Sequence, residues 1–252
     1  MNVFAAQLAE MLYAPPVEGD DLQIVFGGAF DPPHLGHWEL AEAARRWAEE
    51  RSGGRVDVIW TVAIQPYHKP TDRRVQHYDT RIREKLVTQL LAQQGGLWHQ
   101  GGRHRLLSND ELAAGWEKMG RDPISWWAQP TYTIDTLAAA QALDEIGENP
   151  WLLVGADAAG GLADWHRWGE LKQQANILVG RRVGEDDPRR PDDLDPGRWR
   201  VLTRSVRAES STRIRRLIEE EAWEEVEQAC GPKVAKKLRR LSGRTAGENK
   251  AA

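Results

Sequence analysis

The chain has 252 residues, 40% of them hydrophobic, and a formal net charge of −4 at neutral pH. This length and apolar content are enough for one large α/β domain or two smaller ones. No apolar run reaches the roughly 18 residues of a membrane-spanning helix, and the negative charge argues against a general nucleic-acid binder.

The single cysteine, Cys230, excludes an internal disulfide and a multi-cysteine metal site. It fits a reducing cytoplasm, and its place beside Gly231 and Pro232 predicts a helix end rather than a nucleophile. Residues 1–13 lack a basic region and carry Glu10, so we do not expect a signal peptide. These features predict a cytoplasmic protein.

Strand-like apolar runs alternate with stretches of helical spacing along the chain. The predicted strands are residues 22–26, 56–64, 151–154, 177–179 and 199–202. The predicted helices are residues 38–51, 80–93, 133–146, 162–173, 212–219, 222–229 and 233–241. This alternation predicts a Rossmann-like, doubly wound parallel sheet with helices on both faces. Ligands then bind beyond the carboxyl ends of the strands, where the strand order reverses.

The domain organisation follows from the same pattern. We expect an N-terminal extension at 1–20, a single domain at 21–241 and a disordered tail at 242–252. The part from about 205 to 241 is predicted to be a small helical C-terminal region. Residues 93–105 and 184–197 are predicted to be surface loops, because they are rich in Gly or in Asp, Pro and Arg.

The stretch Gly27–His37, GGAFDPPHLGH, connects the first predicted strand to the first predicted helix. Glycines in such a turn let backbone N–H groups approach an anion, and the helix start adds further N–H groups and the positive end of its dipole. His34 and His37 are three residues apart and can face one bound group as hydrogen-bond donors. The combination suits a nucleotide triphosphate. The structural alternative is a tight turn in which one histidine caps the helix and the other is packed.

Two polar segments come later in the chain. Residues 66–70, PYHKP, follow the second strand, and Lys69 is a point charge suited to a phosphate. A proline-stiffened loop with exposed polar tips explains this segment equally well. Residues 131–137, TYTIDTL, open a predicted helix, and a threonine cap there leaves backbone N–H groups that could hold a carboxylate. An ordinary N-cap is the alternative.

Two further segments follow the strand at 151–154. Asp157, in Gly155-Ala156-Asp157, lies just past the strand end, where an acidic residue commonly binds ribose hydroxyls; it could also cap the next helix. Residues 165–168, WHRW, offer a tryptophan face for stacking on a pyridine or purine ring. On spacing alone, tryptophans at i and i+3 more often pack in the core.

The last motif, SSTRIR at 210–215, places hydroxyl groups and an arginine at a helix start. Such a helix start makes a compact anion site, although a Ser/Thr cap with surface arginines has the same pattern. Glu209 precedes it, and a carboxylate near a triphosphate is unexpected, so its side chain is predicted to point away.

In their order along the chain, these segments resemble the HxGH nucleotidyltransferases, and within them the nicotinate mononucleotide adenylyltransferases, from about residue 22 to 241. They resemble the family segments GGxFDPxHxGH, PPHK, SYTxDTL, GxD, WxxW and ISSTxIR. Ala29 stands where the family usually has Thr, and Glu209 where it usually has an apolar residue. Residues 62–65 also depart from the family pattern, and the 93–105 and 122–127 regions look longer than usual.

The resemblance implies adenylyl transfer from ATP, with Mg²⁺, to nicotinate mononucleotide, giving deamido-NAD and pyrophosphate in NAD biosynthesis. The implied catalytic residues are His34, His37 and Arg215. The implied ATP-binding residues are Gly27, Gly28, Ala29, Phe30, His34, Gly36, His37, Gly155, Asp157, Ser210, Ser211, Thr212 and Arg215. The implied mononucleotide-binding residues are His68, Lys69, Tyr132, Thr133, Trp165 and His166.

In that family, Trp165 would stack on the nicotinate ring, and the backbone N–H groups of Thr133 and His166 would bind its carboxylate. No dedicated metal ligands are visible in the sequence, and whether the chain forms a homo-oligomer stays open. The alternatives are the same reaction with nicotinamide mononucleotide or both acceptors, transfer to pantetheine phosphate or from CTP, and a nucleotide-binding module without catalysis.

Overall fold

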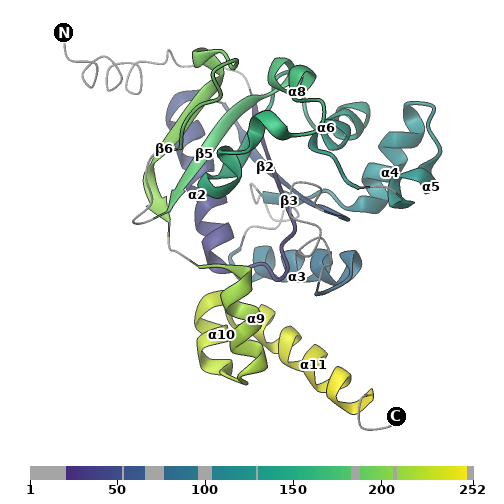
Figure 1. Ribbon diagram of the computed structural model, residues 1–252, viewed down its shortest axis with the longest axis vertical. Helices are drawn as coiled ribbons and strands as arrows, with labels where there is room; N and C mark the ends of the chain where they lie inside the picture. Colours follow the sequence, from purple (N-terminus) through teal and green to yellow (C-terminus); the bar gives the residue numbers. More distant parts are fainter. Residues whose placement is uncertain are drawn as a thin grey trace.

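The computed structural model describes residues 21–52, 54–65, 77–95, 104–128, 130–182, 188–206 and 209–248, and Figure 1 shows its ribbon. Within these ranges, six parallel strands form one sheet in the order β3-β2-β1-β4-β5-β6. The strands are β1 (Leu22–Gly28), β2 (Val56–Val62), β3 (His104–Leu106), β4 (Trp151–Gly155), β5 (Asn176–Arg182) and β6 (Trp199–Val206). The order reverses between β1 and β4, so the predicted Rossmann-like fold is confirmed, and a ligand crevice is expected beyond the carboxyl ends of these two strands.

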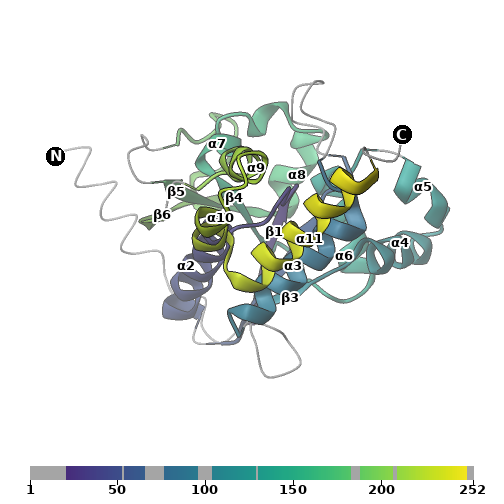
Figure 2. The ribbon, with the colours of Figure 1, turned by 90° about the horizontal axis from the view of Figure 1, so that it is seen from below.

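Helices cover both faces of the sheet. They are α2 (Leu35–Ser52), α3 (Thr80–Gln93), α4 (Asn109–Lys118), α5 (Pro123–Ala128), α6 (Thr133–Ala142), α7 (Ala156–Ala159), α8 (Trp168–Gln174), α9 (Ser211–Glu219), α10 (Trp223–Cys230) and α11 (Pro232–Glu248). Short 3₁₀ turns lie at Leu162–Asp164 and Pro196–Arg198. The C-terminal helices α9, α10 and α11 gather at one end of the sheet, and α11 packs along α3 (Figures 1 and 2).

The alternation of side chains along β1 separates two cores. Ile24 and Phe26 belong to the cluster under α2, α3, α10 and α11, whereas Val25 belongs to the cluster under α4, α6 and α8. Successive strand residues point to opposite faces, so a central parallel strand needs apolar residues at both positions. β1 is thereby fixed in the middle of the sheet, with its glycine-rich end at the crevice.

Several predicted boundaries differ from the structure. The end of the predicted loop 93–105 forms the edge strand β3, with His104 buried. The helix predicted at 162–173 is interrupted, because Arg167 takes a left-handed conformation with φ of 54° before α8 begins. The helix predicted at 133–146 ends at Ala142, and α11 continues to Glu248 through the predicted disordered tail. Residues 1–20 and 249–252 lie outside the described ranges.

Cys230 is the last residue of α10, and Gly231 follows with φ of 80°. The thiol is buried, and burial raises its pKa to about 12. The predicted helix end at Cys230 is therefore confirmed, and a thiol with this pKa is protonated at neutral pH.

We expect His104, which is buried between Trp60 and Glu42, to make the stability of the fold depend on pH. Its Nδ1 accepts a hydrogen bond from Trp60 Nε1 at 3.2 Å, and its Nε2 lies 3.2 Å from Glu42 Oε2. Burial lowers the pKa of His104 below its ordinary value of 6.5, although Glu42 opposes this shift. The unfolded chain therefore binds more protons than the folded chain below that pH, and stability falls as pH drops. When the pH is lowered from about 7.5 to about 5.5, we expect the urea midpoint of the wild type to decrease. The urea midpoint of His104→Gln should decrease less over the same range. Equal falls in both proteins would contradict this role.

Candidate active site

The turn after β1 is shaped by glycines that face aromatic and imidazole rings. A Cβ atom on Gly28 would lie 3.0 Å from the Phe30 ring, which is itself buried. A Cβ atom on Gly36 would lie 3.0 Å from His34 Nδ1, so the glycine leaves room for that ring. Phe30 has φ of 48°, which turns the chain away from the strand direction. The turn then leads directly into α2.

His34 and His37 form a stacked pair at the start of α2. Their ring centroids are 3.6 Å apart and the ring planes differ by 25°. The backbone N–H of His34 donates to His37 Nδ1 at 3.2 Å, and the backbone N–H of His37 donates to His34 Nδ1 at 3.3 Å. A nitrogen that accepts a hydrogen bond carries no proton, so each neutral ring carries its proton on Nε2. The three-residue spacing thus brings the two rings into contact, and each ring keeps one Nε2–H donor that the Nδ1 contacts do not use.

The start of α9 docks on the same turn, about 180 residues later in the sequence. Ser211 Oγ donates to Pro32 O at 2.9 Å, and Arg215 Nη1 donates to Asp31 O at 2.6 Å. Arg215 Nη2 also donates to Thr212 Oγ1 at 3.1 Å. These bonds bring two predicted anion-binding segments together, since the residues of the SSTRIR motif hold the backbone of the DPP turn.

Glu209 and Ser210 lie just before α9. Ser210 is the N-cap, and its side chain accepts from Arg213 N at 3.2 Å. The Glu209 carboxylate pairs with Arg213 Nη1 at 2.9 Å. The negative charge of this residue is therefore matched by a neighbouring arginine on the same helix.

Asp31 has a structural role that the sequence analysis did not identify. Its buried carboxylate accepts hydrogen bonds from the backbone N–H groups of His77 at 2.6 Å and Tyr78 at 3.0 Å. These bonds fix the residues that lead into α3 against the turn after β1.

Arg83 is a second residue that the sequence analysis missed. It is only 1% exposed, and all five guanidinium donors are used. The acceptors are the backbone oxygens of Tyr78 at 2.9 Å, Ala29 at 2.7 Å, Ala63 at 2.7 Å and Ile64 at 3.1 Å, and Thr80 Oγ1 at 3.1 Å. Arg83 thus holds together the chain segments that follow β1 and β2. Its position in the apolar stripe of α3, with Leu86, Val87 and Leu90, was the available signal.

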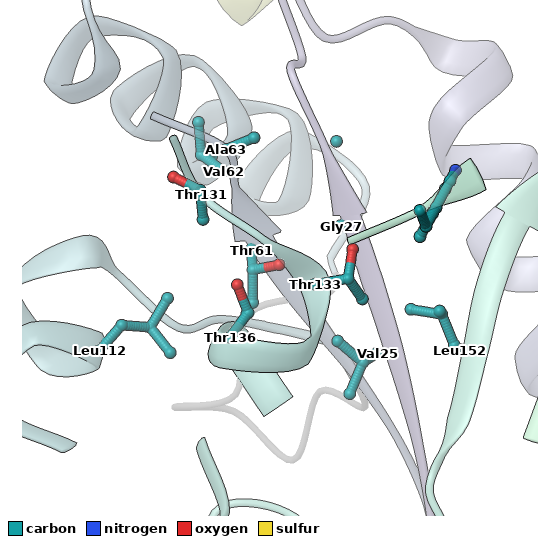
Figure 3. Close-up of a pocket in the computed structure, with 12 residues that line it drawn as sticks. Val25, Gly27, Thr61, Val62, Ala63, Leu112, Thr131, Thr133, Thr136 and Leu152 are labelled. Atoms are coloured by element: carbon teal, nitrogen blue, oxygen red, sulfur yellow. The ribbon is translucent and has the colours of Figure 1, made fainter. Parts of the chain in front are cut away.

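A cleft that is partly open to solvent lies at the carboxyl ends of β1 and β2 (Figure 3). Its lining combines apolar side chains, small residues and hydroxyl groups from β1, β2, β4, α4, α6, the residues that follow β2 and precede α6, and the loop before α8. The lining residues are Val25, Gly27, Gly28, Thr61, Val62, Ala63, Leu112, Thr131, Thr133, Thr136, Leu152 and Trp165. Four predicted site residues, Gly27, Gly28, Thr133 and Trp165, therefore meet in one cleft, and the other eight were not predicted.

Helix α6 begins without a side-chain cap. The N-cap is Tyr132, so the prediction of a threonine cap was wrong and Thr133 is the first helical residue. The Tyr132 ring instead stacks on His166, with centroids 3.8 Å apart. The first-turn N–H groups of α6 have no cap from the Tyr132 side chain, so the helix start can receive an anionic group from the cleft.

The two tryptophans of the WHRW segment, Trp165 and Trp168, have different environments. Trp165 lines the cleft, whereas Trp168 is buried in the core and donates from Nε1 to Asp193 at 3.1 Å. Lys172 also pairs with Asp193 at 2.7 Å. This part of the predicted 184–197 loop is therefore held against α8.

The 122–127 region forms α5 and supports the cleft. Trp126 is buried and donates from Nε1 to Asn109 Oδ1 at 3.0 Å. Asn109 Nδ2 donates in turn to Val62 O at 2.8 Å and to Glu84 at 2.9 Å. A chain of buried polar contacts thus links this region to a residue in the wall of the cleft.

Two other predicted site residues, Gly155 and Asp157, lie at the carboxyl end of β4. Gly155 ends β4, and a Cβ atom there would lie 2.6 Å from Asp157 Oδ1, so this carboxylate lies over the strand end. His68 and Lys69 lie outside the described residues. Within the described ranges, no group of three or more His, Cys, Asp or Glu side chains is arranged to hold a metal ion. No helix in these ranges is long and apolar enough to cross a membrane.

Residues 25–90 match a family model described as cytidylyltransferase-like. A Pseudomonas entomophila protein named "Probable nicotinate-nucleotide adenylyltransferase" is 32% identical over 171 residues, which are 68% of this chain and 64% of the relative, so this alignment spans less than two thirds of that protein. A Stenotrophomonas maltophilia protein of the same name is 31% identical over 202 residues, 78% of each chain. The structure of Plasmodium falciparum nicotinic acid mononucleotide adenylyltransferase complexed with NaAD has a TM-score of 0.59 and 11% identity, covering 88% of this chain and 96% of that chain.

Proposed function

The chain belongs to the nicotinate-nucleotide adenylyltransferase family, and from this premise we propose that it transfers the adenylyl group of ATP to nicotinate mononucleotide. The products are deamido-NAD and pyrophosphate. The observation that supports the proposal most strongly is the stacked pair of His34 and His37 at the start of α2, in the segment that follows the cleft residues Gly27 and Gly28.

In the proposed reaction, a phosphate oxygen of the mononucleotide attacks the α-phosphorus of ATP. A new P–O–P bond forms, the bond to the β-phosphate oxygen breaks, and pyrophosphate leaves with the electron pair. No protein nucleophile is needed, so catalysis consists of positioning the substrates and stabilising the developing charge. Mg²⁺ enters with ATP as part of the substrate.

In this proposal one group of site residues binds ATP, and we call this group the ATP half of the site. The Nε2–H groups of His34 and His37 donate to phosphate oxygens as negative charge builds on them. Arg215, whose direction is fixed by Asp31 O and Thr212, holds the β- and γ-phosphates together with the N-terminus of α9. The ATP half also includes Gly27, Gly28, Ala29, Phe30 and Gly36, the hydroxyl groups of Ser210 and Ser211, and Gly155 and Asp157. Gly155 and Asp157 are assigned to the ribose of ATP.

The second group of site residues binds the mononucleotide, and we call this group the acceptor half of the site. Trp165 stacks on the pyridine ring, and the backbone N–H groups of Thr133 and His166 bind its carboxylate. Tyr132 supports His166 through the ring stack. His68 and Lys69 complete the set on the phosphate side. We place this chemistry in a single domain at residues 21–241 of a cytoplasmic enzyme.

The experiment is an isotope test with nicotinate mononucleotide as the acceptor. ATP labelled at the α-phosphorus should transfer its label to the dinucleotide, and ATP labelled at the γ-phosphorus should release it as pyrophosphate. The proposal would be overturned if the γ-label appeared in inorganic phosphate while no α-label appeared in the dinucleotide. That result would show hydrolysis of ATP instead of adenylyl transfer.

A further inference from the structure

Arg167 combines an unusual backbone conformation with two ion pairs. Its φ of 54° lies in the left-handed region, which a residue with a long side chain rarely adopts without support from its surroundings. Its Nε and Nη2 atoms donate to the two carboxylate oxygens of Glu170 at 2.8 and 2.5 Å. Its Nη1 atom donates to Asp135 Oδ1 at 3.3 Å. The guanidinium therefore bridges the start of α8 and the first turn of α6.

Arg167 and its neighbour His166 both contact residues at the start of α6. His166 stacks on Tyr132 at 3.8 Å, just before Thr133, and Arg167 pairs with Asp135, just after it. Two consecutive loop residues are thus attached to two residues that flank Thr133. Trp165 directly precedes them and lines the same cleft as Thr133. The two contacts therefore join the segment that carries Trp165 to the segment that carries Thr133.

Asp135 also places a negative charge in the first turn of α6. Its side chain is only 14% exposed, and burial raises its pKa while Arg167 opposes that shift. A carboxylate at this position repels an anion that approaches the same helix start, and a paired guanidinium reduces that repulsion.

We propose that Arg167 is a positioning residue of the acceptor half of the cleft: anchored on Glu170, it holds Asp135 and keeps Trp165 opposite the start of α6. The inference rests on the proposed function for the identity of the acceptor. It predicts that Arg167 affects recognition of the mononucleotide and not of ATP, because its contacts lie on the acceptor side alone.

The test is steady-state kinetics with each substrate varied separately. We expect Arg167→Gln to raise KM for nicotinate mononucleotide about tenfold, with kcat and KM for ATP changed less than about twofold, because it breaks the contact and leaves the repelling carboxylate of Asp135 without this guanidinium. Asp135→Asn breaks the same contact but also removes the repelling charge, so it should raise this KM less, and the double variant should be no worse than Arg167→Gln alone. Arg167→Lys keeps the charge and should restore part of the affinity, whereas Arg167→Asn tolerates the left-handed backbone and should not.

The control is Arg189→Gln, which removes a surface ion pair with Asp192 whose side chains are 84% and 85% exposed. It should leave both KM values unchanged. An unchanged mononucleotide KM in Arg167→Gln, or an equal rise of both KM values, would overturn the positioning role. Failure of the wild type to make deamido-NAD would instead overturn the proposed function, so the two failures are distinguishable.

Discussion

The His37→Ala variant is expected to lose about two to three orders of magnitude in kcat, because removal of one donor that stabilises transition-state charge has effects of this size. In the proposed reaction each ring of the stacked pair donates one Nε2–H group to the triphosphate, and alanine removes one of these two donors. It also leaves the backbone N–H of His34 without its Nδ1 acceptor. The measurement is kcat for deamido-NAD formation at saturating ATP and mononucleotide.

A control must separate chemistry from folding. The His37 ring contacts the buried Phe30 ring, with centroids 5.0 Å apart, so the unfolding midpoint of His37→Ala is measured alongside kcat, and the variant should remain folded under the assay conditions. His77→Ala removes a histidine whose backbone N–H, and not its ring, binds Asp31, and it should retain kcat within about twofold. Turnover of His37→Ala close to the wild-type value would refute the assignment of this residue.

The Arg83→Met variant is expected to lose about 3 to 5 kcal/mol of stability, because its substitution leaves several buried carbonyl oxygens without donors. Methionine fits the apolar stripe of α3 but supplies none of the five hydrogen bonds that reach Ala29, Ala63 and the other acceptors. Urea unfolding followed by circular dichroism gives the free energy directly.

The matched control is Arg81→Met on the same helix. Arg81 is 69% exposed and pairs with Asp110 only at 3.5 Å. Exposed pairs of this kind contribute at most about 1 kcal/mol, so the two substitutions should differ clearly. Similar losses in both variants would mean that the buried network around Arg83 does not stabilise the fold.

The sequence predicted the parts of the structure that follow from local patterns. Apolar strands alternating with helices gave the parallel sheet, and the predicted helix at 80–93 matches α3 in full. β3 was missed because its three residues are too few for a periodic signal, and its pairing partner β2 lies more than 40 residues earlier. α4 was missed although Ser108 and Glu111 form a capping box that the sequence contains.

The candidate site also combines contacts that a local motif predicts with contacts that depend on tertiary packing. His34 and His37 come from one short motif, so spacing was sufficient to place them together. The docking of Arg215 on Asp31 spans 184 positions, and the use of Arg83 as a buried donor depends on which carbonyl groups the fold leaves unpaired. Such contacts are set by tertiary packing, and no local pattern states them.

The central claim is best tested by measuring pyrophosphate release from ATP and Mg²⁺ with nicotinate mononucleotide and nicotinamide mononucleotide supplied separately. We expect release with the nicotinate form at a rate at least about tenfold higher, because the proposal assigns its carboxylate to the start of α6, which has no side-chain cap. Equal rates would contradict the assignment of the cleft beside Thr133 and Trp165 to a carboxylate. Release with neither acceptor would contradict the proposed reaction itself.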